Sequence, residues 1–315
     1  MGFWETFYKR PATKKPLIVS EKDFIPKQEE LPSGYYWGHP DFESWSDLIM
    51  ENYSYDGTLK IKYPENVLRY WYYQTNCQHC GIYKDDILIG SISGKVRDLS
   101  IFHETYLGYN VDFLCVDLSY RKKGWAGKLI RELSRIAKEN KIWTGLHLSV
   151  KKCLDTTAEL YSYRCATSSP IKKKNLNHIK LIPETKAIDI LPTNSDKVWF
   201  LEHVHIPENF PGSVLRFGEY GHIVGFPLIF SYGCQKIKTF YSYIFNIAPA
   251  YRDDALVALR QHCWNKGFDQ IYIILPYKLK MPWIQFGAKM WMHLYNWNTK
   301  YYPPTKDKET VFWTY

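Results

Sequence analysis

The sequence lacks the features that would mark a membrane or secreted protein. The longest stretch without charge, about Gly221 to Gln235, is shorter than the ~18 apolar residues that a membrane span requires. The cysteines are odd in number, seven, and scattered, which argues against a disulfide framework and favours a reducing compartment. No apolar segment follows the charges near the N-terminus, so we expect no signal peptide. We therefore expect a cytoplasmic protein without a membrane span.

A metal site and a nucleic-acid site are also unsupported. Cys77-Gln78-His79-Cys80 has no second C-x-x-C and no pair of histidines at zinc spacing, so we expect core cysteines and no metal site. His203-Val204-His205 lacks an accompanying carboxylate pattern and is better explained as a surface strand or loop. Lysine clusters such as Lys172 to Lys174 accompany no recognised nucleic-acid motif, so we expect no nucleic-acid partner.

Aromatic residues and positive charge are in excess. Trp, Tyr and Phe number 12, 26 and 16, which is 17% of the 315 residues. Such an excess of aromatic residues is typical of a protein that binds an apolar or extended ligand. The net charge of +9, from 41 basic and 32 acidic residues, favours an anionic partner such as a phosphorylated cofactor.

The residue pattern predicts the same sequence of elements twice. In the first half we predict helices over Ser46–Tyr53 and Val67–Tyr73 and a loop over Gly34–Trp45. A hairpin over His79–Tyr83 and Ile87–Ser93 follows, then a strand over Tyr109–Leu118, a helix over Lys128–Asn140 and a strand over Ile142–Val150. In the second half, Phe226–Tyr232 and Thr239–Ile247 are predicted strands, Asp253–Lys266 a helix and Phe268–Leu275 a strand. Two copies of strand–strand–helix–strand predict a duplicated α/β fold, with a boundary in Lys172–Pro192.

A basic, glycine-containing turn separates the strong strand from the strong helix of the first copy. Arg121-x-x-Gly124-x-Ala126 resembles the coenzyme A diphosphate loop of the GCN5-related N-acyltransferases. Small residues let the backbone N–H groups face a diphosphate at a helix N-terminus. The alternative is an ordinary turn with solvated lysines. The second copy has Ala248-Pro249-Ala250 at this place, so we expect only the first to bind a nucleotide.

Longer segments resemble the N-myristoyltransferase family, in the same order along nearly the whole chain. Asp112–Val116 and Leu129–Leu133 resemble the family's acyl-CoA-binding strand and helix. The other similar segments are Phe3–Thr6, Leu31–Trp37, Glu51–Tyr53, Tyr241–Tyr243, Asp254–Val257, Lys266–Asp269 and Leu294–Trp297.

The resemblance implies two pseudo-symmetric lobes of the GCN5-related fold around a mixed twisted sheet. Residues 1–33 would be an arm over the coenzyme, 34–180 the acyl-CoA lobe and 181–315 a shortened peptide lobe. We expect a short, divergent member such as a viral copy.

It also implies roles for individual residues. The backbone N–H groups of Phe113 and Leu114 would form an oxyanion hole, and the terminal carboxylate of Tyr315 would deprotonate the substrate amine. The residues implied to bind the coenzyme are Phe3, Trp4, Cys115, Val116, Arg121, Lys122, Lys123, Gly124, Trp125, Ala126 and Gly127. Those implied to bind the peptide are Tyr53, Asp56, Tyr63, His147, Ser149, Tyr161, Tyr241 and Tyr243.

The peptide side departs from the family pattern. The acidic run after Tyr53 is reduced to Ser54-Tyr55-Asp56-Gly57, and the amine-handling segment is His147-Leu148-Ser149-Val150. The asparagine usual before Phe113 is Asp112.

We expect transfer of myristate from myristoyl-CoA, as acyl donor, to the N-terminal glycine of peptides or nascent proteins. No tightly bound cofactor is expected, and the protein should be a monomer. The alternatives are a catalytically impaired binder of acyl-CoA or lipidated peptide, a transferase of shorter acyl chains and, last, a basic nucleic-acid binder.

Overall fold

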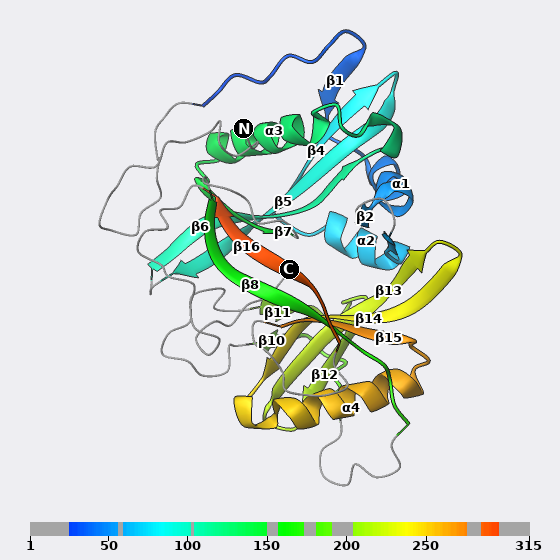
Figure 1. Cartoon of the computed structure of the whole chain (residues 1–315). Helices are drawn as coiled ribbons and strands as arrows, with labels where there is room; N and C mark the ends of the chain where they lie inside the picture. The colour runs from blue at the N-terminus through cyan, green and yellow to red at the C-terminus, as the bar shows by residue number, and fades with distance from the viewer. Residues whose placement is uncertain are drawn as a thin grey trace. The chain divides into compact units, whose positions relative to one another are not determined.

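The computed structural model comprises two compact units (Figure 1). It describes residues 25–55, 59–101, 104–149, 157–172, 181–190, 204–275 and 285–295. Among these, the first unit is built from residues within 25–97, 107–160 and 291–295, and the second from residues within 98–106 and 161–290. Neither unit is one continuous piece of chain, because residues 98–106 belong to the second unit and residues 291–295 return to the first. The functional division into 1–33, 34–180 and 181–315 stays a prediction.

The first unit is a sheet with helices on both faces. Its strand order is β1 (Tyr35–Gly38), β4 (Cys77–Lys84), β5 (Ile87–Ile101), β6 (Glu104–Val116), β7 (Thr144–Ser149) and β16 (Gln285–Tyr295). The helices are α1 (Phe42–Asn52), α2 (Glu65–Tyr72) and α3 (Trp125–Glu139), and a small hairpin joins β2 (Ser54–Tyr55) to β3 (Leu59–Lys62).

Successive side chains of a strand point to opposite faces of the sheet, so buried side chains pack on both faces. On one face, Ile82 of β4 and Ile92 of β5 pack with Leu129 and Leu133 of α3. On the other face, Trp45 of α1 packs edge-on against the imidazole of His79 in β4 at 5.5 Å. Side chains two residues apart on a strand share a face, so one sheet buries both sets.

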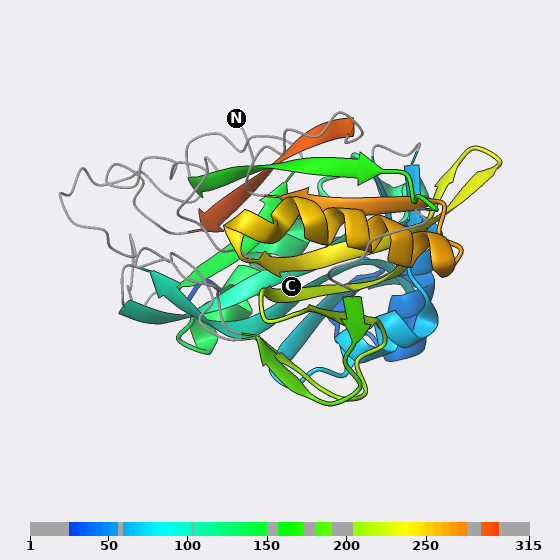
Figure 2. The same ribbon diagram turned by 90° about the horizontal axis from the view of Figure 1, so that it is seen from below.

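The second unit repeats the plan of the first. Its strand order is β8 (Thr157–Ser168), β15 (Gln270–Leu275), β14 (Gln235–Ile247), β13 (Gly221–Tyr232), β12 (Ser213–Phe217) and β9 (Leu181–Pro183). Helix α4 (Arg252–Asn265) packs on this sheet (Figure 2). Strand β10 (Ile188–Ile190) pairs with β11 (Val204–Ile206).

The crossover connections confirm the predicted duplication. In the first unit β6 leads through α3 to β7, and β6 and β7 are parallel. In the second unit β14 leads through α4 to the parallel strand β15. The α/β fold of two similar lobes is therefore confirmed.

Element boundaries differ from prediction where capping or pairing decides them. The segment Gly34–Trp45, expected to be a loop, contains β1, which pairs in register with β4 from Tyr35 opposite Lys84. Helix α1 begins at Phe42 because the Asp41 carboxylate accepts the Ser44 N–H at 2.7 Å. Helix α3 begins at Trp125 rather than Lys128. None of the described helices is long and apolar enough to cross a membrane.

His79 is buried and neutral between the sheet and the aromatic helices. Its Nε2–H donates to the Tyr72 carbonyl at 3.1 Å, so its Nδ1 accepts from the Ser93 hydroxyl at 2.8 Å. The Tyr72 ring stacks on it at 4.3 Å. Burial lowers the pKa of His79 from 6.5 to about 4.

We predict that stability falls as pH drops from about 6.5 towards 4, because the unfolded chain takes up a proton at this residue and the folded chain does not. The midpoint of urea unfolding should decrease between pH 7 and pH 5, and His79→Asn should reduce that decrease. The control is His205→Asn, because His205 is an exposed histidine of β11 in the second unit. An unchanged pH dependence in His79→Asn would contradict the buried, neutral assignment.

Candidate functional site

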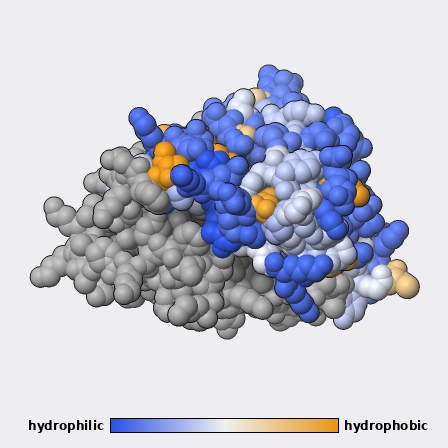
Figure 3. Space-filling view, turned by 90° about the horizontal axis from the view of Figure 1, so that it is seen from above, coloured by the Kyte–Doolittle hydropathy of each residue, from blue (hydrophilic) through white to orange (hydrophobic). Residues whose placement is uncertain are grey.

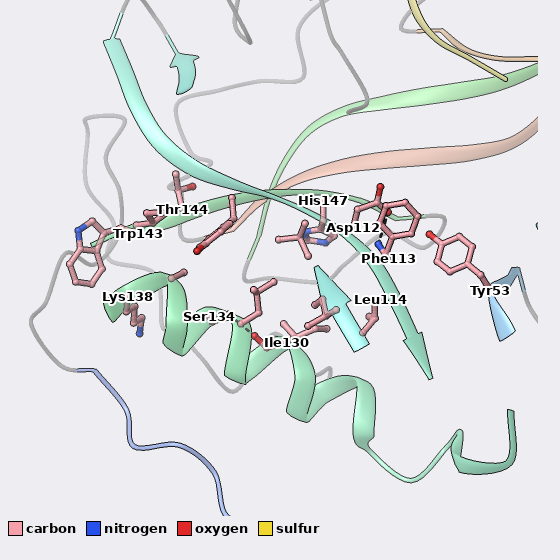
Figure 4. Close-up of a pocket in the computed structure, with 17 residues that line it drawn as sticks. Tyr53, Asp112, Phe113, Leu114, Ile130, Ser134, Lys138, Trp143, Thr144 and His147 are labelled. Carbon is pink, nitrogen blue, oxygen red and sulfur yellow. Dashed lines mark hydrogen bonds between the residues drawn. The ribbon is translucent and has the colours of Figure 1, made fainter. Parts of the chain in front are cut away.

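A cavity of about 260 Å³ lies inside the first unit, between β6, β7 and α3 (Figure 4). Its apolar wall includes Ile130 and Leu133 from one face of α3. Figure 4 places Trp143, Thr144 and Lys138 towards one end of the cavity and Phe113, Leu114 and Tyr53 towards the other. The full lining is Tyr53, Ile92, Tyr109, Val111, Asp112, Phe113, Leu114, Ile130, Leu133, Ser134, Ala137, Lys138, Ile142, Trp143, Thr144, Gly145 and His147.

The cavity exists because two parallel strands stop pairing. The register joins β6 to β7 from Gly108 opposite Thr144 to Asn110 opposite Leu146. Beyond Asn110, the β6 residues that follow line the cavity instead of continuing this ladder. On its other edge β7 stays paired with β16 as far as Ser149. After Asn110, the edge of β6 that had paired with β7 is therefore no longer part of that ladder.

Phe113 holds the backbone of β6 in an unusual conformation at this point. Its φ of +50° lies in the left-handed region, which costs a non-glycine residue about 1–2 kcal/mol. The buried ring offsets that cost by packing against Trp45 at 5.1 Å, Tyr63 at 5.5 Å and Tyr53 at 6.0 Å. This break in the extended backbone occurs at the two residues predicted to form the oxyanion hole.

One of the two predicted oxyanion donors already has a partner. The Phe113 N–H donates to the carboxylate Oδ1 of its neighbour Asp112 at 2.7 Å. The Leu114 side chain is 37% exposed and lines the cavity. The structure thus brings Phe113 and Leu114 to the cavity, with a carboxylate that the sequence analysis had not placed among the site residues.

The turn before α3 has the geometry of an anion-binding loop. Lys122 (φ +62°) and Gly124 (φ +85°) are both left-handed, and Gly124 is the N-cap of α3. Within the described chain, the N–H groups of residues 122–127 have no recorded partner. Residues 122–124 are exposed. Unpaired N–H groups, the positive end of the helix dipole and two lysines together favour an anion here.

The side chain of Arg121 connects this turn by hydrogen bonds to the end of β6 and to the segment after α1. Its Nε donates to the Val116 carbonyl at 2.9 Å, and its other guanidinium nitrogens donate to the Ser54 hydroxyl and the Asn52 carbonyl. The second unit repeats the first of these bonds, since Nε of Arg252 donates to the Ile247 carbonyl at 3.2 Å. The arginine therefore ties the strand end to the turn in both units, including the one without glycine.

Other residues predicted to bind the coenzyme have buried side chains. Cys115 is 2% exposed and Val116 8%, and the ring of Trp125 packs against Tyr35 at 4.6 Å in the core. Any contact of Cys115 and Val116 with a ligand would have to use their backbone. Ala126 and Gly127 lie in the first turn of α3, beside the exposed loop.

The residues predicted to bind a peptide are distributed over both units. Tyr53 and His147 line the cavity, and Tyr63 is buried behind Phe113. Ser149 ends β7 and Tyr161 lies in β8. In the second unit Tyr241 and Tyr243 are buried against Phe226. Phe3, Trp4, Asp56 and Tyr315 lie outside the described residues.

Sequence reasoning missed the wall that α3 contributes. The apolar residues of the predicted helix over Lys128–Asn140 recur with helical spacing, a pattern that predicts one buried stripe, yet Ile130, Leu133 and Ala137 of that stripe line the cavity. Nothing in a 3.6-residue period distinguishes a residue facing a core from one facing a cavity.

On the face of the molecule shown in Figure 3 the described surface is mostly hydrophilic, with only small separate hydrophobic patches.

The cysteines of the C-x-x-C segment have the environment of core residues. Burial raises the pKa of Cys77 to about 11 and raises the pKa of Cys80 further. Cys80 is packed in the core beneath α3. The described part of the chain contains no cluster of His, Cys, Asp and Glu that could hold a metal ion.

Comparisons with known proteins agree with this geometry. The family described as "Myristoyl-CoA:protein N-myristoyltransferase, N-terminal domain" matches residues 19–157. A glycylpeptide N-tetradecanoyltransferase of Plasmodium falciparum is 26% identical over 183 residues, 53% of this chain and 42% of that protein. Glycylpeptide N-tetradecanoyltransferase 2 of Bos taurus is 21% identical over 376 residues, 94% of this chain and 73% of that protein.

Solved structures show that the likeness of fold extends along the chain. N-myristoyltransferase of Saccharomyces cerevisiae with bound myristoyl-CoA and inhibitors superposes with a TM-score of 0.71 at 14% identity, covering 98% of this chain and 94% of that one. A second structure of the yeast enzyme, with bound myristoyl-CoA, gives a TM-score of 0.67 and covers 95% of this chain and 88% of that one. The chain spans less than half of the Plasmodium relative, 42% of its length, but carries the family's fold in both units. Residues 19–157 are therefore similar to the N-terminal domain of the N-myristoyltransferase family, and the chain as a whole has the fold of the yeast N-myristoyltransferase structures.

Proposed function

We propose that the protein is an acyltransferase that moves a myristoyl group from myristoyl-CoA to the N-terminal glycine amine of a protein substrate. The observation that carries the proposal is the cavity at the divergence of β6 and β7. It joins an apolar wall on α3 to the backbone break at Phe113, and the same helix begins at an anion-binding turn. The relatives named above are glycylpeptide N-tetradecanoyltransferases.

The turn at residues 122–127 is suited to the coenzyme A diphosphate. Its N–H groups and the exposed Lys122 and Lys123 would bind the phosphate oxygens, while Arg121 holds the turn through its backbone contacts. The turn of the second unit has Pro249, which lacks an N–H, and the ring of Tyr251 stacks on Tyr220 at 3.7 Å. We therefore assign the coenzyme to the first unit alone.

The acyl chain would lie along the apolar wall formed by Ile130, Leu133 and Ala137. Ile130 to Ala137 spans seven residues of helix, about 10 Å at 1.5 Å per residue. Burial of each methylene contributes about 0.8 kcal/mol, so an enclosed wall of this length favours a long chain over an acetyl group.

In the reaction the neutral glycine amine attacks the thioester carbon. The C–N bond forms as the C–S bond breaks, coenzyme A leaves as the thiolate, and the amine loses a proton to a base. Negative charge develops on the carbonyl oxygen, where backbone N–H donors at Phe113 and Leu114 would stabilise it. An α-amine has a pKa of about 7.7–8.0, so a weak base suffices, and the Tyr315 carboxylate stays the predicted one.

One observation favours the alternative of an impaired enzyme that binds acyl-CoA without efficient turnover. The Asp112 carboxylate accepts the Phe113 N–H that the oxyanion would require. The cytoplasmic location and the monomeric state stay predictions.

The proposed function predicts that the protein adds one myristoyl group to a peptide with N-terminal glycine. A single-turnover mixture of protein, myristoyl-CoA and such a peptide should show this mass gain on the amine by mass spectrometry. The same peptide with its amine acetylated should gain nothing. Binding of myristoyl-CoA without any transfer would support the impaired binder instead.

The loop assignment predicts that Gly124→Ala weakens coenzyme A binding at least 10-fold. The substitution strains a left-handed position and places a methyl group in front of the N–H cradle, although no protein atom lies within 4 Å of the new Cβ. Gly233→Ala is the matched control, because Gly233 (φ +56°) is also left-handed and also has open space. Equal coenzyme A affinities of the two variants by calorimetry would argue against the loop site.

The acyl-wall assignment predicts that Ala137→Phe shortens the acyl chain that the protein prefers. Wild-type affinity should rise along a series from acetyl-CoA to myristoyl-CoA, and the variant should stop gaining affinity at a shorter chain because the ring fills the cavity. Acetyl-CoA affinity serves as the internal control and should stay equal. The same length dependence in both proteins would place the chain elsewhere.

A further inference from the structure

We propose that Asp112 restrains the oxyanion hole, so that its carboxylate competes with the thioester oxygen for the Phe113 N–H. The inference rests on the proposed function, because it concerns the carbonyl that the proposed reaction polarises. It assigns Asp112 a positioning role that neither the family match nor the fold alone provides.

The structure shows the hydrogen bond with which a thioester oxygen would have to compete. Oδ1 of Asp112 accepts the Phe113 N–H at 2.7 Å, within the range of a charge-assisted hydrogen bond. An N–H already donating to a carboxylate has less capacity for a second, weaker acceptor such as a neutral thioester oxygen. The rings of Trp45, Tyr53 and Tyr63 pack against Phe113 in its left-handed conformation, in which the N–H lies beside this carboxylate.

Charge adds to the effect of the hydrogen bond. Asp112 is the one carboxylate among the described residues that line the cavity. The other ionisable groups of that lining are Tyr53, Tyr109, Lys138 and His147. The transition state would place negative charge on the carbonyl oxygen, beside this carboxylate. Two like charges repel most strongly where the local dielectric constant is low.

The substitution Asp112→Asn removes the charge of the side chain and leaves its shape nearly unchanged. Asn has nearly the same size, and its side-chain oxygen can still accept the Phe113 N–H, but it carries no charge and competes less strongly. Removal of one oxyanion donor costs an enzyme about 10²–10³-fold in rate, so release of a restrained donor should recover part of that factor.

The experiment compares wild type, Asp112→Asn and Asp112→Ser with myristoyl-CoA carrying ¹³C at the thioester carbonyl. Infrared difference spectra of the bound thioester report how strongly its carbonyl is polarised, whether or not transfer occurs. Single-turnover transfer to an N-terminal glycine peptide reports the rate. Both variants should bind myristoyl-CoA with wild-type affinity, shift the carbonyl band to lower wavenumber and transfer the acyl group at least 10-fold faster.

Asp86→Asn is the matched control, because Asp86 is an exposed residue of the β4–β5 turn and the change removes the same charge. It should behave like wild type in both measurements. If wild type transfers myristate and Asp112→Asn is no faster, with an unchanged carbonyl band, the Asp112 inference is wrong and the proposed function stands.

The spectroscopic readout also distinguishes the remaining outcomes. If no variant transfers myristate but Asp112→Asn and Asp112→Ser lower the carbonyl wavenumber, the restraint is supported and the proposed transfer activity is overturned. If no variant transfers and the band does not move, both are overturned. Circular dichroism and myristoyl-CoA affinity verify that each variant is folded, and Asp112→Ser provides the comparison if Asp112→Asn does not fold.

Discussion

The site depends on the point where β6 and β7 cease to pair. Up to Asn110 and Leu146 the two parallel strands share a ladder, and beyond it β6 bends under the left-handed conformation of Phe113. A backbone polar group released from a sheet must find another partner, since leaving it buried and unpaired costs free energy. The Phe113 N–H donates to the Asp112 carboxylate, and both residues line the cavity.

The two units show which parts of this plan belong to the fold and which belong to the site. Both have the parallel strand–helix–strand crossover and the arginine that bonds back to the end of the preceding strand. The first unit alone, within the described chain, has a left-handed glycine at the helix N-cap, where the second has Tyr251. The arginine bond is therefore a feature of the fold that both units share, whereas the left-handed glycine distinguishes the turn to which we assign the anion.

Sequence patterns predicted the repeated elements because these depend on local periodicity, as in the stripe of α3 and the strand through Phe113. They missed β1, which exists because Tyr35–Gly38 pairs with a strand more than forty residues away. Contacts between distant segments also decide the site, and local patterns do not predict them. Phe113, Gly124 and His147 could be named from resemblance, but the cavity wall at Ala137 and the bond from Phe113 to Asp112 required three-dimensional contacts.

A crystal structure of the protein with myristoyl-CoA would test the assignment of the β6–β7 cavity as the acyl-CoA site, because it locates every part of the donor at once. We expect the diphosphate on the N–H groups of residues 122–127, the acyl chain between β6, β7 and α3, and the thioester carbonyl beside Phe113 and Leu114. A donor bound elsewhere, with the β6–β7 cavity still empty, would contradict the assignment of this cavity as the acyl-CoA site.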